Sequence, residues 1–120
     1  MANQQSQEIT QAWNKLAFAL GDDLRTIQSE VQQGISQLYS FNHGEFFAVL
    51  REEIASNGKE LVIVAAAGKN SMPCINEIHR KAKANGFYSI RLHTLRPKPM
   101  LKMGAHLGFK PAETILRAVL

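Results

Sequence analysis

Residues 60–95 read ELVIVAAAGKNSMPCINEIHRKAKANGFYSIRLHTL. Leu61 to Ala66 is a continuous apolar run, which is typical of a strand covered on both faces. A polar turn that contains a glycine follows, and apolar residues then recur at helical spacing until Asn85-Gly86, a pair that predicts the end of a helix. Residues 88–95 alternate between apolar and polar side chains, as a half-exposed strand does. The stretch therefore predicts a strand, a turn, a helix and a second strand.

The C-terminal residues continue this order of elements. Residues 96–99 (RPKP) predict a rigid turn, because proline fixes the backbone angle φ. Residues 100–107 predict a short helix, and residues 113–120 predict a final strand. The pair Gly108-Phe109 lies just before that strand.

The residues before position 60 predict a hairpin and two helices. Residues 45–51 contain aromatic and β-branched side chains and predict a strand, and Asn57-Gly58 then predicts a tight hairpin turn into the next strand. Two segments further upstream carry apolar residues at helical spacing, with Gly21 and two aspartates between them. The first apolar stripe consists of Ile9, Trp13, Leu16 and Leu20, and the second consists of Leu24, Ile27, Val31, Ile35 and Leu38.

Length and composition suit one soluble domain. The chain has 120 residues, 45% of them apolar, so it can bury one core but hardly a second. We expect a single domain over residues 1–120, with the polar residues 1–8 frayed. There is no apolar run of the roughly 20 residues that a membrane span needs, and the N-terminus does not resemble a secretory signal. The single cysteine, Cys74, fits a reducing compartment. A cytoplasmic location is expected, and association with a virion stays open.

Charge is divided unevenly along the chain. Residues 1–58 contain three basic and seven acidic side chains, a net charge of −4, whereas residues 59–120 contain eleven basic and three acidic ones, a net of +8. A positive half suits an anionic partner, although solvated helix faces would give the same pattern. The basic residues that could track a phosphate backbone are Arg80, Lys81, Lys83, Arg91, Arg96, Lys98 and Lys102. No nucleic-acid-binding motif accompanies them.

The turn at residues 66–71 is the first candidate for chemistry. A loop that runs from a strand into a helix N-terminus presents free backbone N–H groups and the positive end of the helix dipole, which suits an anion. Lys69 would add a positive charge, and Ser71 is a good candidate for the helix N-cap. A plain strand–helix connection would have the same sequence.

Two strings in the C-terminal half carry a resemblance to a known family: residues 86–97, GFYSIRLHTLRP, and residues 107–111, LGFKP. Over about residues 46–120 the chain resembles the compact GNAT-like proteins, with the acyl-CoA N-acyltransferase fold, that bacteriophages and prophages carry. The resemblance implies an α/β (α+β) fold with a mixed, mostly antiparallel sheet of four to five strands and helices on both faces. It also implies that two amphipathic helices replace the usual first strand.

The resemblance implies a binding site for acetyl-CoA or coenzyme A. Backbone N–H groups near Val64–Ala66 would polarise the thioester carbonyl, and Gly68–Ser71, including Asn70, would hold phosphate. The family's pyrophosphate pattern falls on Ala66, Lys69 and Ser71, of which only Ser71 is close to the expected small residue. A lysine at position 69 therefore departs from the pattern, because glycine there allows close approach of the backbone to phosphate.

The resemblance also shows where catalytic groups are substituted. The family's tyrosine, about four residues before the Gly-Phe pair, corresponds to Gly104, and Pro97 stands where an asparagine often precedes the short helix. We therefore expect a degenerate site in a protein that acts as a binding or structural component, with other virion or phage proteins as partners. An active acetyl-CoA-dependent N-acyltransferase and a nucleic-acid-binding module are the alternatives. A homodimer is open as well, because the two amphipathic helices leave an apolar face that a second copy could cover.

Other reactive side chains give weaker signals. His79, His93 and His106 show no spacing typical of metal ligands, so no metal site is expected. Glu52 and Glu53 lie near the end of a strand, where GNAT enzymes place a base, but glutamates near a hairpin are usually only solvated. Cys74 lies in the first turn of a helix with no base beside it in sequence, so burial is expected rather than nucleophilic use.

Overall fold

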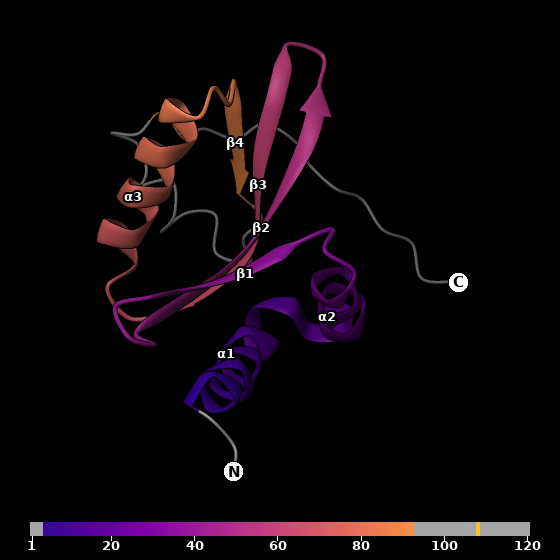
Figure 1. Cartoon of the computed structure of the whole chain (residues 1–120), viewed down its shortest axis with the longest axis vertical. Coiled ribbons are helices and arrows are strands. Elements are labelled where there is room, and N and C mark those ends of the chain that lie inside the picture. Colours follow the sequence, from indigo (N-terminus) through magenta and orange to yellow (C-terminus); the bar gives the residue numbers. More distant parts are fainter. Residues whose placement is uncertain (1–3, 93–107, 109–120) are drawn as a thin grey trace.

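The computed structural model describes residues 4–92 and Gly108. The sheet has four strands in this part of the chain. Helices lie on both of its sides (Figure 1). The elements in chain order are α1 (Gln4–Leu20), a 3-10 turn (Gly21–Asp23), α2 (Leu24–Gln32), β1 (Gln37–Phe41), β2 (Phe46–Ala55), β3 (Gly58–Gly68), α3 (Ser71–Ala84) and β4 (Ser89–Leu92). Among these residues, no helix is long and apolar enough to cross a lipid bilayer.

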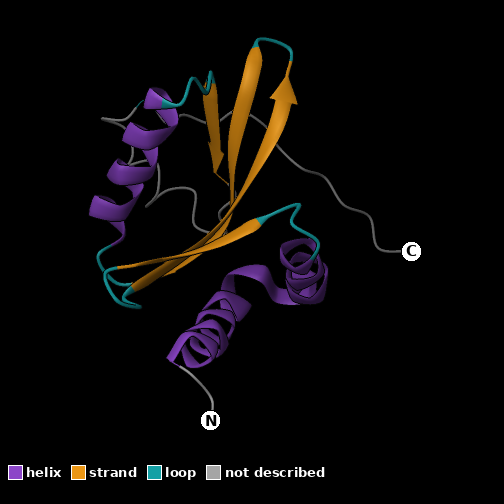
Figure 2. Ribbon diagram, viewed as in Figure 1, coloured by secondary structure: helices purple, strands orange, loops and turns teal. Residues whose placement is uncertain are grey.

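The sheet is mixed and mostly antiparallel, as the sequence predicts. Its strand order is β1-β2-β3-β4; β1 with β2 and β2 with β3 are antiparallel pairs, whereas β3 and β4 are parallel. A parallel pair needs a crossover connection, and α3 supplies it. Two residues, Ser56 and Asn57, link β2 to β3, which confirms the predicted hairpin. The hairpin extends beyond the helices at one end of the molecule (Figure 2).

Each face of the sheet packs against its own helices. On one face, α3 contributes Cys74, Ile75, Ile78 and Ala82 to a core with Phe46, Ala48, Leu61 and Ile63. On the other face, α1 and α2 contribute Ala12, Leu16, Leu20 and Ile27 to a core with Phe47, Val49 and Ala65. Because successive strand residues point to opposite faces, Phe46 and Phe47 divide between the two cores. The predicted helices on both faces are therefore confirmed.

The helical prediction for α2 was too long. The helix ends at Gln32, and Gly34 follows with φ +80°, a backbone conformation that favours glycine. Leu38 lies in β1, paired with Val49, and packs against the α1 and α2 core from that strand, whereas Ile35 is 52% exposed, so neither belongs to the apolar face of the helix. Their helical spacing from Val31 is coincidental, because pairing with the distant strand β2 decides the conformation of residues 37–41. The strand β1 was not predicted.

Other predicted boundaries shift by a few residues. The strands expected at 45–51 and 61–66 extend over β2 and β3, and the helix end at Asn85-Gly86 is confirmed. Of the predicted strand at 88–95, Ser89–Leu92 form β4. The turn, short helix and final strand predicted for residues 96–120 lie outside the described residues, as do Pro97, Gly104 and His106.

Candidate functional site

A break in strand register marks the centre of β3. Val49 on β2 pairs with Ala65, but the next residue, Leu50, pairs with Ile63, so Val64 has no partner on β2. Val64 and Ala65 both pack toward the core formed with α1 and α2, although adjacent strand residues normally point to opposite faces. This is a β-bulge, a feature that leaves backbone polar groups unpaired and is common beside active sites.

The described part of β4 pairs with the residues of β3 that precede the bulge. The parallel pairs run from Glu60 with Ser89 to Ile63 with Leu92, and β3 continues for five more residues, to Gly68. The surrounding side chains are short: Ala65 is buried, and Ala66 and Ala67 are partly buried. Short side chains therefore follow the bulge at Val64 along β3.

The loop after β3 is shaped by its contact with β2. A Cβ atom on Gly68 would lie 2.1 Å from the carbonyl oxygen of Glu45 and 2.6 Å from the Cα atom of Phe46. The φ angle of Gly68 is +134°, a value that side-chain-bearing residues rarely adopt. Gly68 is thus required for the close approach of two strands, a role that involves no phosphate.

The next two residues also contact Glu45. The backbone N–H of Lys69 donates to the Glu45 carbonyl oxygen at 2.7 Å, so this donor is not available to an anion. The side-chain amide of Asn70 donates to the Glu45 carboxylate at 3.2 Å. Asn70 has left-handed φ (56°) and occupies the N-cap of α3, with no capping bond from its side chain. The prediction that Ser71 is the N-cap was therefore off by one position, since Ser71 is the first helical residue.

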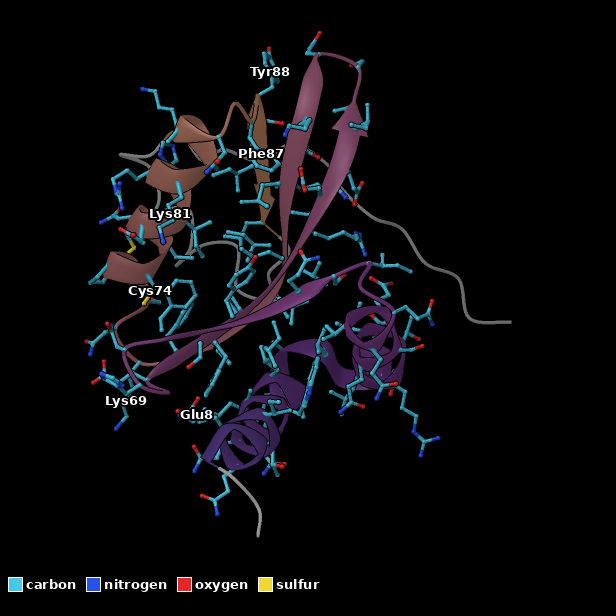
Figure 3. The ribbon with its side chains drawn as sticks, viewed as in Figure 1. Glu8, Lys69, Cys74, Lys81, Phe87 and Tyr88 are labelled. Carbon is cyan, nitrogen blue, oxygen red and sulfur yellow. The ribbon has the colours of Figure 1, made fainter. Side chains whose placement is uncertain are left out.

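The start of α3 offers few donors to an anion. The first N–H groups of a helix have no partner within the helix, but Pro73, the third helical residue, has no N–H. Ser71 and Met72 can contribute their backbone N–H groups, and the exposed side chain of Lys69 extends from the same end of the sheet (Figure 3). The predicted phosphate loop thus has no donor at Pro73, and its positive charge comes from the Lys69 side chain.

A carboxylate lies close to this helix start. Glu45 accepts the hydrogen bond from Asn70, and its negative charge also acts on Cys74. The pKa of the Cys74 thiol is raised, mainly by burial and further by the charge of Glu45. Cys74 is 3% exposed, and its sulfur accepts a contact from the Asn42 side-chain amide at 3.9 Å. Cys74 is therefore a buried core residue, as predicted, and a negative charge lies beside the start of α3.

The two parts of the predicted cofactor site consequently differ in their fit. The β3 bulge suits a carbonyl and a narrow acyl chain, since backbone groups and small side chains form it. The loop at residues 68–71 does not suit a standard pyrophosphate grip, because its glycine and one of its N–H groups serve the contact with Glu45. Sequence reasoning missed this role of Glu45, because the role depends on the pairing of β2 with β3.

Five charged side chains form a continuous chain of ion pairs on the sheet face that carries α2. Arg51 contacts Glu30 at 2.9 Å and Glu53 at 2.8 Å, and Arg91 contacts Glu53 at 3.0 Å and Glu60 at 2.9 Å. The hydrogen bond from Arg51, and after it the one from Arg91, lowers the pKa of Glu53, although burial opposes the shift. A carboxylate with a lowered pKa is a poor general base, so Glu53 does not fit that role.

Two hollows lie elsewhere in the described structure. One of about 650 Å³ is polar and is lined by Glu8, Ser40, Asn42, His43 and Glu45. The other, about 250 Å³, lies between α3 and the strands β1 to β3, and its walls include Tyr39, Phe41, Leu50 and Phe87. Neither contains the bulge residue Val64. Within residues 4–92 and at Gly108, no group of three or more His, Cys, Asp or Glu side chains could hold a metal ion.

Comparison with known proteins supports the fold. No protein-family model matches the sequence, and no curated protein matches it either. The structure is similar to the crystal structure of TTHA1254 from Thermus thermophilus, with a TM-score of 0.55 and 16% identity over 90% of this chain and 89% of that one. It is also similar to a crystal structure described as a probable acetyltransferase, with a TM-score of 0.55 and 10% identity over 82% of this chain and 76% of that one.

These similarities concern the fold. The chain has a mixed α/β fold that is compatible with a GNAT-like fold and is shared with a structure described as a probable acetyltransferase. At such low identity the comparison carries no residue roles across, so function must be argued from the site itself.

Proposed function

We propose that this chain is a GNAT-like binding protein that binds the acyl-pantetheine part of acetyl-CoA. Its catalytic site is degenerate, and it binds the nucleotide part of the cofactor weakly. The observation that carries the proposal is the bulge at Val64, directly after the residues of β3 that pair with Ser89–Leu92. A backbone N–H that a bulge releases from the strand ladder can bind a thioester carbonyl. The fold shared with a probable acetyltransferase makes such a ligand a reasonable choice.

The weak binding of the nucleotide follows from the geometry of the loop at residues 68–71. A phosphate oxygen binds best to several backbone N–H groups in a concave nest. Here the Lys69 N–H is bonded to Glu45, Pro73 has none, and the Glu45 carboxylate lies close by. Among the remaining groups, the Lys69 side chain is the main positive charge facing an incoming phosphate.

The weak catalytic apparatus follows from the substituted positions. The sequence has Gly104 where the family's tyrosine would protonate the departing thiolate, and Tyr39 and Tyr88 lie on or beside other strands. General acid help is typically worth about 10² to 10⁴ in rate, so its loss would leave binding intact and slow transfer greatly.

Calorimetry with two ligands tests the proposal. We expect both acetyl-CoA and S-acetylpantetheine, which lacks the nucleotide, to bind, with affinities that differ by less than about tenfold, the equivalent of one weak charged contact. Lys69→Glu should lower the affinity for acetyl-CoA about threefold to tenfold and leave that for S-acetylpantetheine unchanged. Lys83→Glu, at an exposed position near the other end of α3, is the matched control.

Three results would count against the proposal. No heat with either ligand would remove acyl-pantetheine binding. If acetyl-CoA bound more than about 100-fold tighter than S-acetylpantetheine, the protein would bind the nucleotide part strongly, because such a ratio of affinities needs several contacts to phosphate. Equal effects of Lys69→Glu and Lys83→Glu would show that only net charge matters.

An active N-acyltransferase is the second candidate, and the bulge favours it too, because a polarised thioester is the first requirement for acyl transfer. Release of free thiol from acetyl-CoA in the presence of amines, followed with a thiol reagent, distinguishes the two. A turnover that saturates with amine would establish the enzyme and remove the degenerate site.

The nucleic-acid hypothesis gains less support from the geometry. Three of its seven basic residues make ion pairs within the described structure: Arg80 and Lys81 with Glu77, and Arg91 with Glu53 and Glu60. An origin in a phage or prophage, virion partners, a homodimer and a cytoplasmic or virion-associated location stay predictions from the sequence.

A further inference from the structure

The chain of ion pairs connects four elements on one sheet face. Glu30 belongs to α2, Arg51 and Glu53 to β2, Glu60 to β3 and Arg91 to β4. Two serines extend it, since the buried Ser36 hydroxyl donates to Glu30 and the Ser89 hydroxyl donates to Glu60. The side chains are 18–33% exposed, so they are partly shielded from water and from screening by salt.

Glu53 and Arg91 hold the central positions. The Glu53 carboxylate accepts from both arginines, and the Arg91 guanidinium reaches carboxylates on two different strands. An arginine can do this because its planar fork carries five N–H donors, whereas a lysine presents a single point charge. The bridge from Arg91 to Glu53 spans β3, because β4 and β2 lie on either side of that strand.

The strand β4 depends on such contacts more than its neighbours do. It has four residues, all partly buried, and it pairs in parallel, a slightly weaker arrangement than antiparallel pairing. Ile90 and Leu92 pack on the α3 side, so Ser89 and Arg91 are its anchors on the opposite face. The ion pairs therefore fix β4 against β3 from the side that lacks α3.

The position of these anchors relates them to the bulge. Arg91 pairs with Val62 and Leu92 with Ile63, and the next residue along β3 is the bulged Val64. A shift of β4 along β3 by one residue would change which backbone groups of β3 are covered. We infer that Arg91 and Glu53 are positioning residues for the acyl ligand: their ion pairs hold β4 in its register on β3, directly before the bulge at Val64. The part of this inference that concerns the ligand rests on the proposed function. The part that concerns the register of β4 rests on the geometry of the ion pairs.

Two measurements on Arg91→Gln test the inference. The first is amide hydrogen exchange, in which we expect residues 61–65 and 89–92 to exchange at least about tenfold faster than in the wild type while β1 and α1 change little, as expected for a local opening. The second is calorimetry, in which we expect the affinity for acetyl-CoA to fall about tenfold. A change of this size lies within the range of effects found for substitutions that alter a binding site without touching the ligand. Arg91→Lys should show intermediate values in both.

Controls separate positioning from general destabilisation. Arg80→Gln removes an arginine of α3 that is 66% exposed and paired with Glu77, and it should change neither measurement. In Arg91→Gln the Glu53 carboxylate loses one of its two arginine partners. The double variant Glu53→Gln with Arg91→Gln removes this carboxylate as well, and it should still show the fast local exchange and the weak binding of acetyl-CoA.

Each outcome bears on the inference. Faster exchange spread evenly over all strands, or affinity in Arg91→Gln equal to that of the wild type, would overturn it. A wild type that binds neither acetyl-CoA nor S-acetylpantetheine would overturn the proposed function and the ligand part of the inference together. Normal wild-type binding with an unaffected Arg91→Gln would overturn the inference alone.

Discussion

Replacing Gly68 with alanine tests whether this glycine serves the sheet. The added Cβ would lie 2.1 Å from the Glu45 carbonyl oxygen and 2.6 Å from the Phe46 Cα atom, both of them backbone atoms that cannot rotate away. The strands would have to separate locally, which would break the Lys69 N–H bond to Glu45, worth about 1 kcal/mol net. The positive φ angle adds about 1–2 kcal/mol for a residue with a side chain. We therefore expect a loss of about 2–4 kcal/mol in the free energy of unfolding, measured by urea denaturation.

The matched control for this variant is Gly34→Ala. Gly34 also has a positive φ angle, +80°, but no atom lies within 4 Å of a Cβ placed there. It should lose only the conformational part, about 1–2 kcal/mol. If Gly68→Ala were no more destabilising than Gly34→Ala, the close approach of the two strands would not be the reason for a glycine at position 68.

Three further predictions concern the core, the thiol and the ion pairs. Leu16→Ala should lower the free energy of unfolding by about 2–5 kcal/mol, because Leu16 is fully buried. Phe18→Ala should change it by less than about 0.5 kcal/mol, because Phe18 is 89% exposed. Equal losses in the two variants would contradict the assignment of the buried face of α1. Cys74 should react slowly with a thiol reagent at pH 7 and rapidly in urea, since burial and the charge of Glu45 raise its pKa; fast native labelling would be inconsistent with this burial. The pKa of Glu53 in the folded protein is below the ordinary value of 4.5. The stability that Glu53 contributes should therefore be complete above pH 4.5 and be lost as the pH falls through its folded-state pKa. The difference in unfolding free energy between the wild type and Glu53→Gln should therefore shrink below about pH 4.5, and a difference that is constant with pH would contradict the assignment.

Much of the fold could be predicted because its signals are local. The apolar run of β3, the Asn57-Gly58 turn and the Asn85-Gly86 helix end are each set by neighbouring residues, and all three appear in the structure. The strand β1 could not be predicted in this way. Its residues are mostly exposed and polar, and Ile35 and Leu38 happen to continue the helical spacing of α2. Only pairing with β2, which is distant in sequence, makes this segment a strand.

The candidate site shows the same limit more sharply. A run of apolar residues such as 61–67 contains no mark of a bulge, because the extra residue is defined only by the register with β2. Gly68 looks like part of an anion loop in the sequence, but the residue that needs its missing side chain is Glu45, more than twenty positions away. In each case the deciding partner lies on another strand.

The two ends of the proposed cofactor site rest on different kinds of chemistry, which would explain why one can persist without the other. The acyl end uses backbone groups released by a bulge, so many side chains are compatible with it as long as the register holds. The phosphate end needs several free N–H groups and no nearby carboxylate, conditions that Glu45 and Pro73 remove. A protein changed in this way should discriminate little between an acyl group on coenzyme A and the same group on a shorter pantetheine. It would then select its ligands by the acyl-pantetheine arm, and the register of β4 on β3, fixed by Arg91 and Glu53, would decide whether that arm can reach the Val64 backbone.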